Sequence, residues 1–411
     1  MTKKTAQAIV QYIGHHGDGV VKTAEETIFV PFVLPGETVK IEFTSGIHAK
    51  LLMVISPSPD RIAPVCPHFG VCGGCVVQCW RQEQYLAWKR ALVEAALSRE
   101  SVRAPVDEIV DAHGEGRRRA VLHARHIGQT LSVGFAGRRS HTIVPIDRCP
   151  ILAPSLAHAI PVAWKIAESL EAIRKPFDIQ FTASEAGLDV DIRGSGPLFP
   201  ETIAKLAAIA AEQRLARITR HGESVSQLAE PAINVGKARV ILPPGSFLQA
   251  TEAGEVALAE LVLDAAGKVR EIVDLFCGLG TFSLRLAEHA KILAVDSDGA
   301  AIAALSRAAR APGLKPVETV TRDLFRRPLT VPELREFGTV VLDPPRQGAE
   351  AQARELAKSK MPRIVYVSCN PASFARDARI LSDAGLKLSR VTPVDQFRYS
   401  PHVELVGVFD R

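Results

Sequence analysis

Cys369 and Glu404 are the residues of this sequence best suited to covalent chemistry on a carbon atom. Cys369 directly follows the apolar run RIVYVS, and Glu404 directly precedes the apolar run LVGVF. A thiol at the carboxyl end of a strand lies at the edge where open α/β sheets bind ligands, and its thiolate form attacks carbon. Glu404 can act as a general base if it folds against that edge. A cysteine that only packs in the core and an ordinary edge-strand glutamate remain the alternatives.

A second group of residues suits the binding of a nucleoside. The stretch DLFCGLGT follows an apolar run, and Gly278 and Gly280 let its backbone turn tightly and approach a ligand. Asp296 ends the run ILAVD, where a carboxylate can accept hydrogen bonds from ribose hydroxyls, and Asp323 is placed to face an adenine ring. The third glycine of a pyrophosphate site is missing, so S-adenosylmethionine fits better than a dinucleotide. A plain strand-to-helix turn, with Asp296 as a helix N-cap, is the alternative.

Asp343 opens the motif DPPR directly after the apolar run TVVL. The two prolines fix an extended bend, so the carboxylate is presented rigidly at the ligand-binding edge of the expected sheet. A loop that merely ends the strand is the alternative.

Four cysteines have the composition of a metal centre. Cys66, Cys72 and Cys75 lie in CPHFGVCGGC, a loop whose glycines allow it to wrap a compact group, and Cys149 lies in DRCPI. By ligand type, four thiolates fit zinc and an iron–sulfur cluster equally, although the spacing is not that of a zinc ribbon. Unliganded core cysteines are the alternative. Cys79 is an additional thiol that we do not assign as a ligand.

Positive charge is concentrated between residues 116 and 140. This stretch holds six arginines and no Asp or Glu, namely Arg117, Arg118, Arg119, Arg125, Arg138 and Arg139. On alternating strands they would form a face that clamps phosphates, or an ordinary solvated face.

The elements that must position these residues fall into three regions. Residues 1–57 contain short strand-like runs and predict a small OB-like β-barrel, and residues 58–240 predict an α+β central domain with antiparallel hairpins. In residues 241–411, buried strands alternate with helices, which predicts a mostly parallel, doubly wound α/β sheet of the Rossmann-like kind. The chain has 411 residues, a net charge of +5 and only seven cysteines, which excludes a disulfide scaffold. It lacks an apolar run of signal-peptide or membrane-span length, so we expect a cytoplasmic protein, and nothing indicates more than a monomer.

Taken in order, DLFCGLGTFSL, AVDSD, LDPPR, VSCNP and HVE closely resemble the RNA 5-methyluridine methyltransferase family. FLQAT resembles the segment before the first strand of that family's catalytic domain, and GDGVV, FVPFVLPGE and VKIEF resemble a TRAM domain. The resemblance implies an enzyme with Cys369 as nucleophile and Glu404 as base. The S-adenosylmethionine contacts that it implies, together with the turn glycine, are Gln249, Phe276, Gly278, Thr281, Asp296, Asp323 and Asp343.

The resemblance also implies a [4Fe–4S] cluster on Cys66, Cys72, Cys75 and Cys149, and an RNA substrate. The implied reaction is attack of the thiolate on C6 of uracil, methylation of C5 and removal of the C5 proton by Glu404. Three positions depart from the family: Thr281 replaces a common Asn, Cys79 a common His, and Arg398 a common Pro.

Several alternatives remain open. Ribosomal RNA, most specifically 23S rRNA, is the expected substrate, with transfer RNA as the alternative. A radical-SAM protein is disfavoured because the sequence has no C-x3-C-x2-C motif. An RNA-binding or iron-sensing protein with an inactive methyltransferase domain is disfavoured because Cys369, Glu404 and Asp343 are all present.

Overall fold

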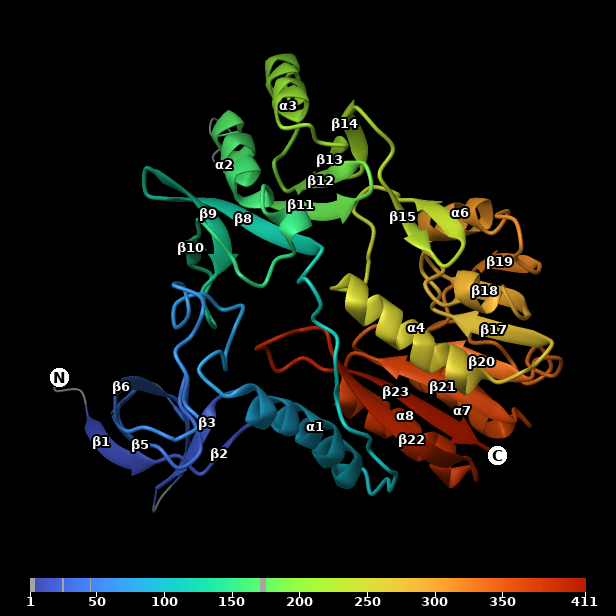
Figure 1. Cartoon of the computed structure of the whole chain (residues 1–411), viewed down its shortest axis with the longest axis horizontal. Helices are drawn as coiled ribbons and strands as arrows, with labels where there is room; N and C mark the ends of the chain where they lie inside the picture. The colour runs from blue at the N-terminus through green and yellow to red at the C-terminus, as the bar shows by residue number, and fades with distance from the viewer. Residues whose placement is uncertain (1–3, 24–25, 45, 171–174) are drawn as a thin grey trace.

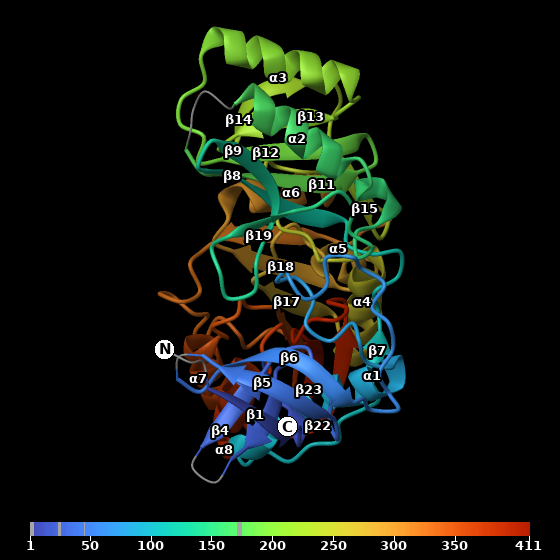
Figure 2. The same ribbon diagram turned by 90° about the vertical axis from the view of Figure 1, so that its left-hand side faces the viewer.

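The computed structural model describes residues 4–23, 26–44, 46–170 and 175–411. Figure 1 shows an N-terminal lobe in blue, a central lobe in green, and a C-terminal lobe in yellow to red. Viewed from the side, the N-terminal and central lobes lie at opposite ends of the molecule, with strands of the C-terminal lobe between them (Figure 2). Among the helices of the described residues, none is both long and apolar enough to cross a bilayer.

The N-terminal lobe consists of two three-stranded antiparallel sheets around one apolar core. One sheet has the order β1-β5-β6 and the other β2-β3-β4. The strands are β1 (Thr5–Ile9), β2 (Tyr12–Ile13), β3 (Gly19–Lys22), β4 (Thr27–Val30), β5 (Thr38–Phe43) and β6 (Ala49–Ser56). Val21, Ile28 and Ile41 are among the fully buried residues that both sheets cover. This arrangement agrees with the small β-barrel predicted from the short apolar runs.

The central lobe is α+β, as predicted. Its seven-stranded sheet has the order β10-β9-β8-β11-β12-β13-β14, in which the β12–β13 pair is parallel. The strands are β8 (Arg119–Ile127), β9 (Thr130–Ala136), β10 (Ile143–Pro145), β11 (Phe177–Ser184), β12 (Gly187–Arg193), β13 (Arg217–Arg220) and β14 (Glu223–Gln227). Helices α2 (Ala159–Ser169) and α3 (Pro200–Glu212) and the short helix η1 (Pro154–Leu156) pack with this sheet.

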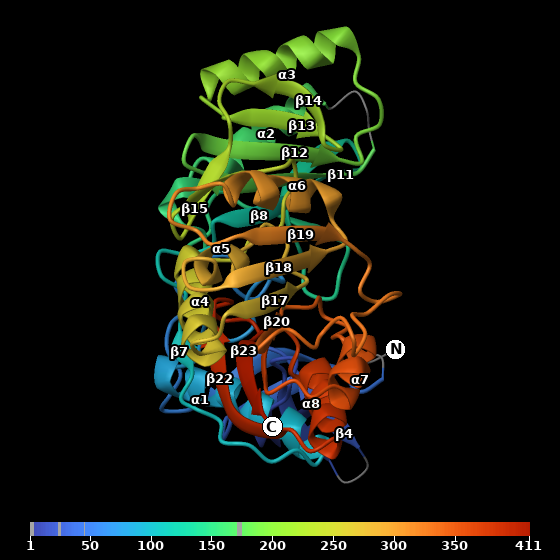
Figure 3. The ribbon, with the colours of Figure 1, turned by 90° about the vertical axis from the view of Figure 1, so that its right-hand side faces the viewer.

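The C-terminal lobe contains the predicted doubly wound sheet, in the order β19-β18-β17-β20-β21-β23-β22-β7. Its strands are β17 (Glu271–Leu275), β18 (Lys291–Asp296), β19 (Val317–Thr321), β20 (Thr339–Leu342), β21 (Arg363–Ser368), β22 (Lys387–Asp395) and β23 (Glu404–Asp410). The first five strands in this order run parallel, and Figure 3 shows β19, β18, β17 and β20 stacked in that order. β23 is antiparallel to both of its neighbours, so its amino end lies at the edge where the parallel strands end.

Helices cover both faces of this sheet. Successive residues of a strand point to opposite faces, so Ile272 and Val273 pack with different groups of helices. Ile272 packs with α4 (Glu252–Ala266), α5 (Ser283–Leu286) and α6 (Gly299–Ala308). Val273 packs with the second group of helices, α7 (Glu350–Lys358) and α8 (Pro371–Asp383). The order of the strands reverses at β17, and the space outside β17 and β20 is where such sheets bind ligands.

Three segments that begin before residue 241 complete this domain. Helix α1 (Gln82–Arg99) packs its buried Val93 and Leu97 into the apolar cluster that contains α8. Strand β7 (Val110–Asp111) pairs in parallel with β22 at the end of the sheet. The hairpin β15 (Ala232–Val235) and β16 (Ala238–Ile241) packs with α6. The periodicity of α1 predicts a helix, but it does not reveal which surface covers its apolar side.

Candidate active site and thiol-lined cavity

The loop after β17 turns tightly and has positive φ values at three residues. Phe276 has a φ of 59°, and Gly278 and Gly280 have φ values of 53° and 88°. A Cβ atom on Gly280 would lie 2.3 Å from Leu305 of α6, so only glycine lets this loop pack directly on the helix. The backbone N–H of Gly278 donates to Oδ2 of Asp296 over 2.9 Å.

Asp296 links the loops that follow β17 and β18. Its Oδ1 accepts a hydrogen bond from the backbone N–H of Asp298 over 2.8 Å. The N-cap of α6 is Asp298, which accepts from the N–H groups of Ala300 and Ala301. Asp296 is therefore not the N-cap, and its carboxylate lies at the edge of the sheet beside the glycine loop.

The third strand end contributes Asp323 and an aromatic pair. Oδ1 of Asp323 accepts from the backbone N–H of Phe325 over 3.0 Å. The rings of Phe325 and Phe276 have their centroids 5.3 Å apart. Thr281 is half-buried, and its backbone carbonyl accepts a hydrogen bond from Arg285 over 2.8 Å. The structure thus places all the predicted strand-end residues on the same edge of the sheet.

Asp274 is a further acidic group at this edge that the sequence analysis did not select. It is fully buried, and its Oδ2 accepts a 2.5 Å hydrogen bond from Ser283 while Oδ1 has no partner among the described residues. Burial, with the charges of Asp343 and Asp296, raises the pKa of Asp274 to about 7, although the Ser283 bond opposes this rise. The sequence signal that could have identified Asp274 is an acidic residue inside the apolar run EIVDL.

Two glutamines connect the predicted cofactor residues to the predicted base. Gln249 donates to Oδ2 of Asp343 over 3.3 Å. Gln396 donates to Oε1 of Gln249 over 2.7 Å and to Oε1 of Glu404 over 3.2 Å. The side-chain oxygen of Gln396 accepts hydrogen bonds from the backbone N–H groups of Ala250 and Thr251. The amide nitrogen of Gln396 is therefore the end that faces the base. Sequence reasoning missed Gln396 because its partners are far from it in the chain.

Cys369 and Glu404 lie on neighbouring antiparallel strands. Ser368 pairs with Leu405 in the β21–β23 ladder, so Cys369 and Glu404 are the next residues outward on the two strands. The half-buried Cys369 lines a cavity of about 250 Å³ together with Arg346. The chemistry predicted for this pair requires such proximity at an accessible cavity.

The electrostatics of the site raise the pKa values of its acidic groups. Burial, with the charges of Glu404 and Asp343, raises the pKa of the Cys369 thiol to about 12, and Arg346 opposes this rise. Burial raises the pKa of Glu404 to about 7, while its hydrogen bond from Gln396 lowers it. Burial, with the charge of Glu404 as the next cause, raises the pKa of Asp343 to about 8. The carboxyl groups of Glu404 and Asp343 therefore lose their protons at a pH closer to 7 than they would in water. The thiol of Cys369 loses its proton at a higher pH than it would in water.

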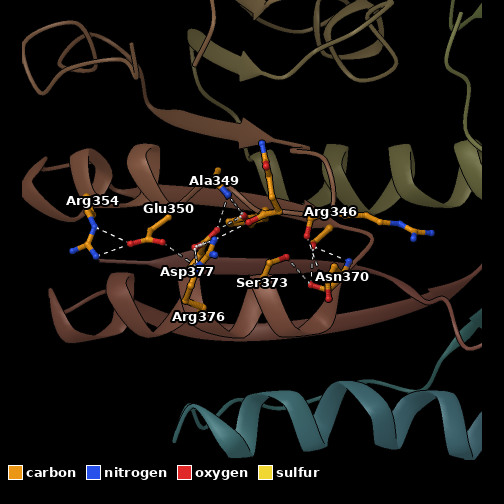
Figure 4. Close-up of polar contacts among 11 residues, drawn as sticks. Arg346, Ala349, Glu350, Arg354, Asn370, Ser373, Arg376 and Asp377 are labelled. Carbon is orange, nitrogen blue, oxygen red and sulfur yellow. Dashed lines mark hydrogen bonds and ion pairs between the residues drawn. The ribbon is translucent and has the colours of Figure 1, made fainter. Parts of the chain in front are cut away.

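Hydrogen bonds join the loop after β20 to the start of α8 (Figure 4), and Cys369 directly precedes the N-cap of α8 in the sequence. Asn370 caps α8 through the N–H of Ala372, and its side-chain amide donates to the carbonyl of Arg346 over 2.8 Å. Farther along, the buried Asp377 accepts from the N–H of Ala349 over 2.7 Å. These bonds hold the DPPR loop and the nucleophile loop in one arrangement.

The segment between β22 and β23 is held by α1 and by the cysteine-rich loop. Lys89 and Tyr85 of α1 both donate hydrogen bonds to the fully buried Asp395. The backbone N–H of Val76 donates to the carbonyl of Tyr399 over 2.8 Å. In Figure 1 this segment, drawn in red, extends toward the N-terminal half of the molecule. The chain elements before the central lobe therefore fix the loop that carries Gln396.

Known proteins that are similar to this chain identify its family. Residues 230–411 match the family described as tRNA (Uracil-5-)-methyltransferase. A protein of Caulobacter vibrioides described as an uncharacterized RNA methyltransferase is 45% identical, over 98% of this chain and 99% of its own length. The 23S rRNA (uracil(1939)-C(5))-methyltransferase of Shewanella amazonensis is 32% identical, over 99% of this chain and 97% of its own length. The chain belongs to the RNA uracil-C5 methyltransferase family.

This methyltransferase is therefore an S-adenosylmethionine-dependent enzyme that modifies RNA, and the resemblance based on its motifs is confirmed. Its fold is similar to that of the Pyrococcus abyssi tRNA (uracil-54, C5)-methyltransferase, solved with S-adenosyl-L-homocysteine. The two structures have a TM-score of 0.75 at 23% identity, over 98% of this chain and 99% of the other.

Four cysteines of the methyltransferase line a second, larger cavity. Cys66, Cys72, Cys75 and Cys149 all line a space of about 750 Å³, and all four thiols are free. Burial raises the pKa of Cys75 to about 12, and the charges of the other three thiols add to this rise. In the part of the chain that the structure describes, no three metal-binding side chains converge as closely as one metal ion requires.

The lining of this cavity includes unpaired N–H donors as well as thiols. Gln78 and Arg117 line the cavity, and their Nε2 and Nε atoms are buried without a hydrogen-bond partner among the described residues. Thiolates surrounded by unpaired N–H donors suit an iron–sulfur cluster, whose sulfur atoms accept hydrogen bonds. Cys79 is buried outside this set, with its Sγ 4.0 Å from the carbonyl of Phe32.

The predicted phosphate-binding face of six arginines is wrong in part. Arg118 is buried and forms an ion pair with Glu255, which also pairs with Arg285 over 2.8 Å, so Arg118 is not available to RNA. Arg117 faces the thiol-lined cavity, and burial lowers its pKa. Arg125 carries a buried Nε atom without a partner among the described residues. The sequence does not reveal that Arg118 is neutralised, because its partner Glu255 lies on α4, far from it in the chain.

The other arginines divide into two kinds. Arg138 and Arg139 pair with the buried Asp18 over 2.6 Å and 2.7 Å, so they join the central lobe to the N-terminal lobe. The guanidinium of Arg119 lies 4.7 Å from the ring centre of the exposed Phe247. Burial lowers the pKa of Arg119 to about 10, and the neighbouring Arg117 adds to the shift.

Proposed function

We propose that this enzyme methylates C5 of a uridine in 23S rRNA, with Cys369 as the nucleophile and Glu404 as the base. The observation that carries the proposal is the position of these two residues at adjacent strand ends, beside a cavity that Cys369 lines. The similarity to the Shewanella amazonensis enzyme over nearly the whole chain supports the choice of RNA. We further propose that it acts as a monomer in the cytoplasm.

The proposed reaction balances as follows. Cys369 loses its proton to solvent and its thiolate forms a bond to C6 of the uracil, which moves the C5–C6 electron pair toward the C4 oxygen. The electron-rich C5 then takes the methyl group of S-adenosylmethionine, and S-adenosyl-L-homocysteine leaves. Glu404 removes the C5 proton, the C5–C6 double bond re-forms, and the bond from Cys369 to C6 breaks.

The raised pKa of Glu404, about 7, supports its role as base. A carboxylate with a pKa near the working pH is strong enough to accept a proton and is still ionised in about half of the molecules. Arg346 favours the thiolate of Cys369, because its charge opposes the rise in the thiol pKa.

We propose that S-adenosylmethionine lies across the ends of β17, β18, β19 and β20. Asp296 would accept hydrogen bonds from the ribose, and Asp323 would face the adenine next to the ring of Phe276. Gln249 and Asp343 would lie nearest the methionine part and the uracil, where they hold the reactants in line. Thr281 and Gly278 complete the proposed set through the turn after β17.

We propose that the four cysteines hold a [4Fe–4S] cluster with a structural role, which fits their common cavity and its unpaired N–H donors. The cluster would supply a rigid cross-link between residues 66–75 and Cys149, and no step of methyl transfer requires an electron. The N-terminal lobe would act as a TRAM domain that contacts RNA.

The deciding experiment maps 5-methyluridine in ribosomal and transfer RNA from cells with and without the gene. Loss of one methyl group from 23S rRNA supports the proposal. Loss from tRNA alone would instead establish the second candidate, which the description of the matching family favours. Purified enzyme with RNA tritiated at C5 of uridine should release tritium, whereas a non-catalytic RNA-binding protein would release none.

A further inference from the structure

Basic side chains from separate parts of the chain line the cavity of Cys369. Five such residues line this space of about 250 Å³, namely His402 and four that we call the basic rim: His15, His16, Arg99 and Arg346. The two histidines lie in the turn between β2 and β3, Arg99 ends α1, and Arg346 lies in the loop after β20. The N-terminal lobe therefore reaches the nucleophile.

The basic rim has no carboxylate of its own. Within the residues that the structure describes, no rim side chain forms an ion pair, and the guanidinium of Arg346 has one hydrogen-bond partner, the ring of His402 at 3.3 Å. Burial lowers the pKa of His15, and His16 and Arg99 lower it further. Burial and the charge of Arg346 lower the pKa of His402 to about 4. The positive charge of the rim therefore comes from Arg99 and Arg346, and the histidines add ring N–H donors, so the rim is a site for an anion that comes from outside the chain.

The turn that carries the two histidines is held in place. Its backbone closes through the N–H of Gly14, which donates to the carbonyl of Asp18 over 2.7 Å. The side chain of Asp18 is buried between Arg138 and Arg139. A Cβ atom on Gly17 would lie 2.5 Å from Val76, so the turn packs closely on the cysteine-rich loop. The histidines thus have a fixed place at the cavity.

The proposed chemistry identifies the anion that the basic rim would bind. Cys369 attacks C6 of uracil, and C6 is bonded to N1, the atom that carries the ribose. The sugar and its phosphates must therefore leave the cavity close to the thiol. We propose that the basic rim binds the phosphodiester next to the target uridine, with His16 and Arg99 as its main contacts.

This inference rests on the proposed function and is tested with whichever transcript, unmodified 23S rRNA or tRNA, the wild-type enzyme methylates. For Arg99→Ala and His16→Ala we expect the KM for that transcript to rise about tenfold and kcat to change much less. Loss of the Arg99 charge should also reduce the slope of log affinity against log salt by about 0.7 to 0.9. Arg99→Lys keeps the charge and should restore most of the slope.

Arg310→Ala is the matched control, because Arg310 is also exposed and follows α6 at the opposite edge of the sheet. Binding of S-adenosylmethionine to each variant, measured by calorimetry, shows that the catalytic domain is intact. If Arg99→Ala and His16→Ala leave both KM and the salt slope at wild-type values, the inference is wrong and the proposed function stands. If the wild-type enzyme methylates neither transcript, the proposed function fails instead.

Discussion

The amide nitrogen of Gln396 lies 3.2 Å from the carboxylate of Glu404, and the same nitrogen lies 2.7 Å from the side-chain oxygen of Gln249. One amide therefore contacts both the proposed base and a proposed cofactor residue. Its orientation is fixed by the backbone N–H groups that bind its carbonyl. This geometry leads to the first of four predictions.

Replacing Gln396 should shift the pH dependence of catalysis. The hydrogen bond from Gln396 lowers the pKa of Glu404, so Gln396→Met should raise that pKa further above about 7. Because the base works in its ionised form, the acid limb of the pH profile of kcat should move upward by about one pH unit. Gln352→Met removes another buried glutamine, which among the described residues hydrogen-bonds with the backbone of Leu329, and should leave the profile unchanged. An unshifted profile for Gln396→Met would show that the bond does not tune the base.

Glu404→Gln should trap the covalent intermediate. The glutamine cannot accept the C5 proton, so the methylated base stays bonded to Cys369 and gives a slower band on a denaturing gel. Cys369→Ala should show no such band and should lose turnover by roughly 10⁴-fold or more, with S-adenosylmethionine binding retained. Methylation by Cys369→Ala at a rate near that of the wild type would falsify the mechanism.

The cysteines should differ in their effect on bound iron. Anaerobically purified wild-type protein should contain iron and sulfide, and Cys75→Ala should lose both, because Cys75 lines the thiol-lined cavity. Cys79→Ala is the matched control, since Cys79 is buried but lies outside that set. Bound zinc without iron in the anaerobic wild-type protein would exclude the cluster.

The buried Asp274 should make stability depend on pH. Its pKa of about 7 in the folded protein exceeds its ordinary value of 3.8, so the folded state holds the proton more tightly than the unfolded state. The free energy of unfolding should therefore fall as the pH rises from about 4 to about 7, by a few kcal/mol at about 1.4 kcal/mol per unit. Asp274→Asn should weaken this fall in thermal unfolding without S-adenosylmethionine.

Ser283→Ala provides the opposite test. The Ser283 bond lowers the pKa of Asp274, so its removal should raise that pKa and extend the fall in stability to a higher pH. Identical pH dependence in Asp274→Asn, Ser283→Ala and wild type would show that this carboxylate does not control stability.

The sequence predicts the strand-end residues well for a physical reason. Asp296, Asp343 and Cys369 each follow an apolar run directly, and parallel strands bring their carboxyl ends to one edge whatever their order. The local pattern therefore determines where these side chains lie, even though the strand order could not be read from it.

What the sequence does not predict depends on contacts between distant residues. Gln396 meets Gln249 across 147 positions of the chain, and Lys89 meets Asp395 across 306. The same holds for Arg118, whose charge looks free in the sequence and is neutralised by Glu255 in the fold. Periodicity indicates only that a side is apolar or charged, and the tertiary structure decides what covers it.

The position of β23 between β21 and β22 has a consequence for biosynthesis. The strand that begins with Glu404 is translated after every other strand of its sheet, yet it occupies an interior place. A nascent chain that stops before it leaves β21 and β22 without their shared neighbour. Helix α1 is synthesised some 270 residues before α8. Its apolar side therefore lacks this partner helix until α8 has been made. Residues 404–410 must therefore be synthesised before this sheet, and the group of side chains at its edge, can be complete.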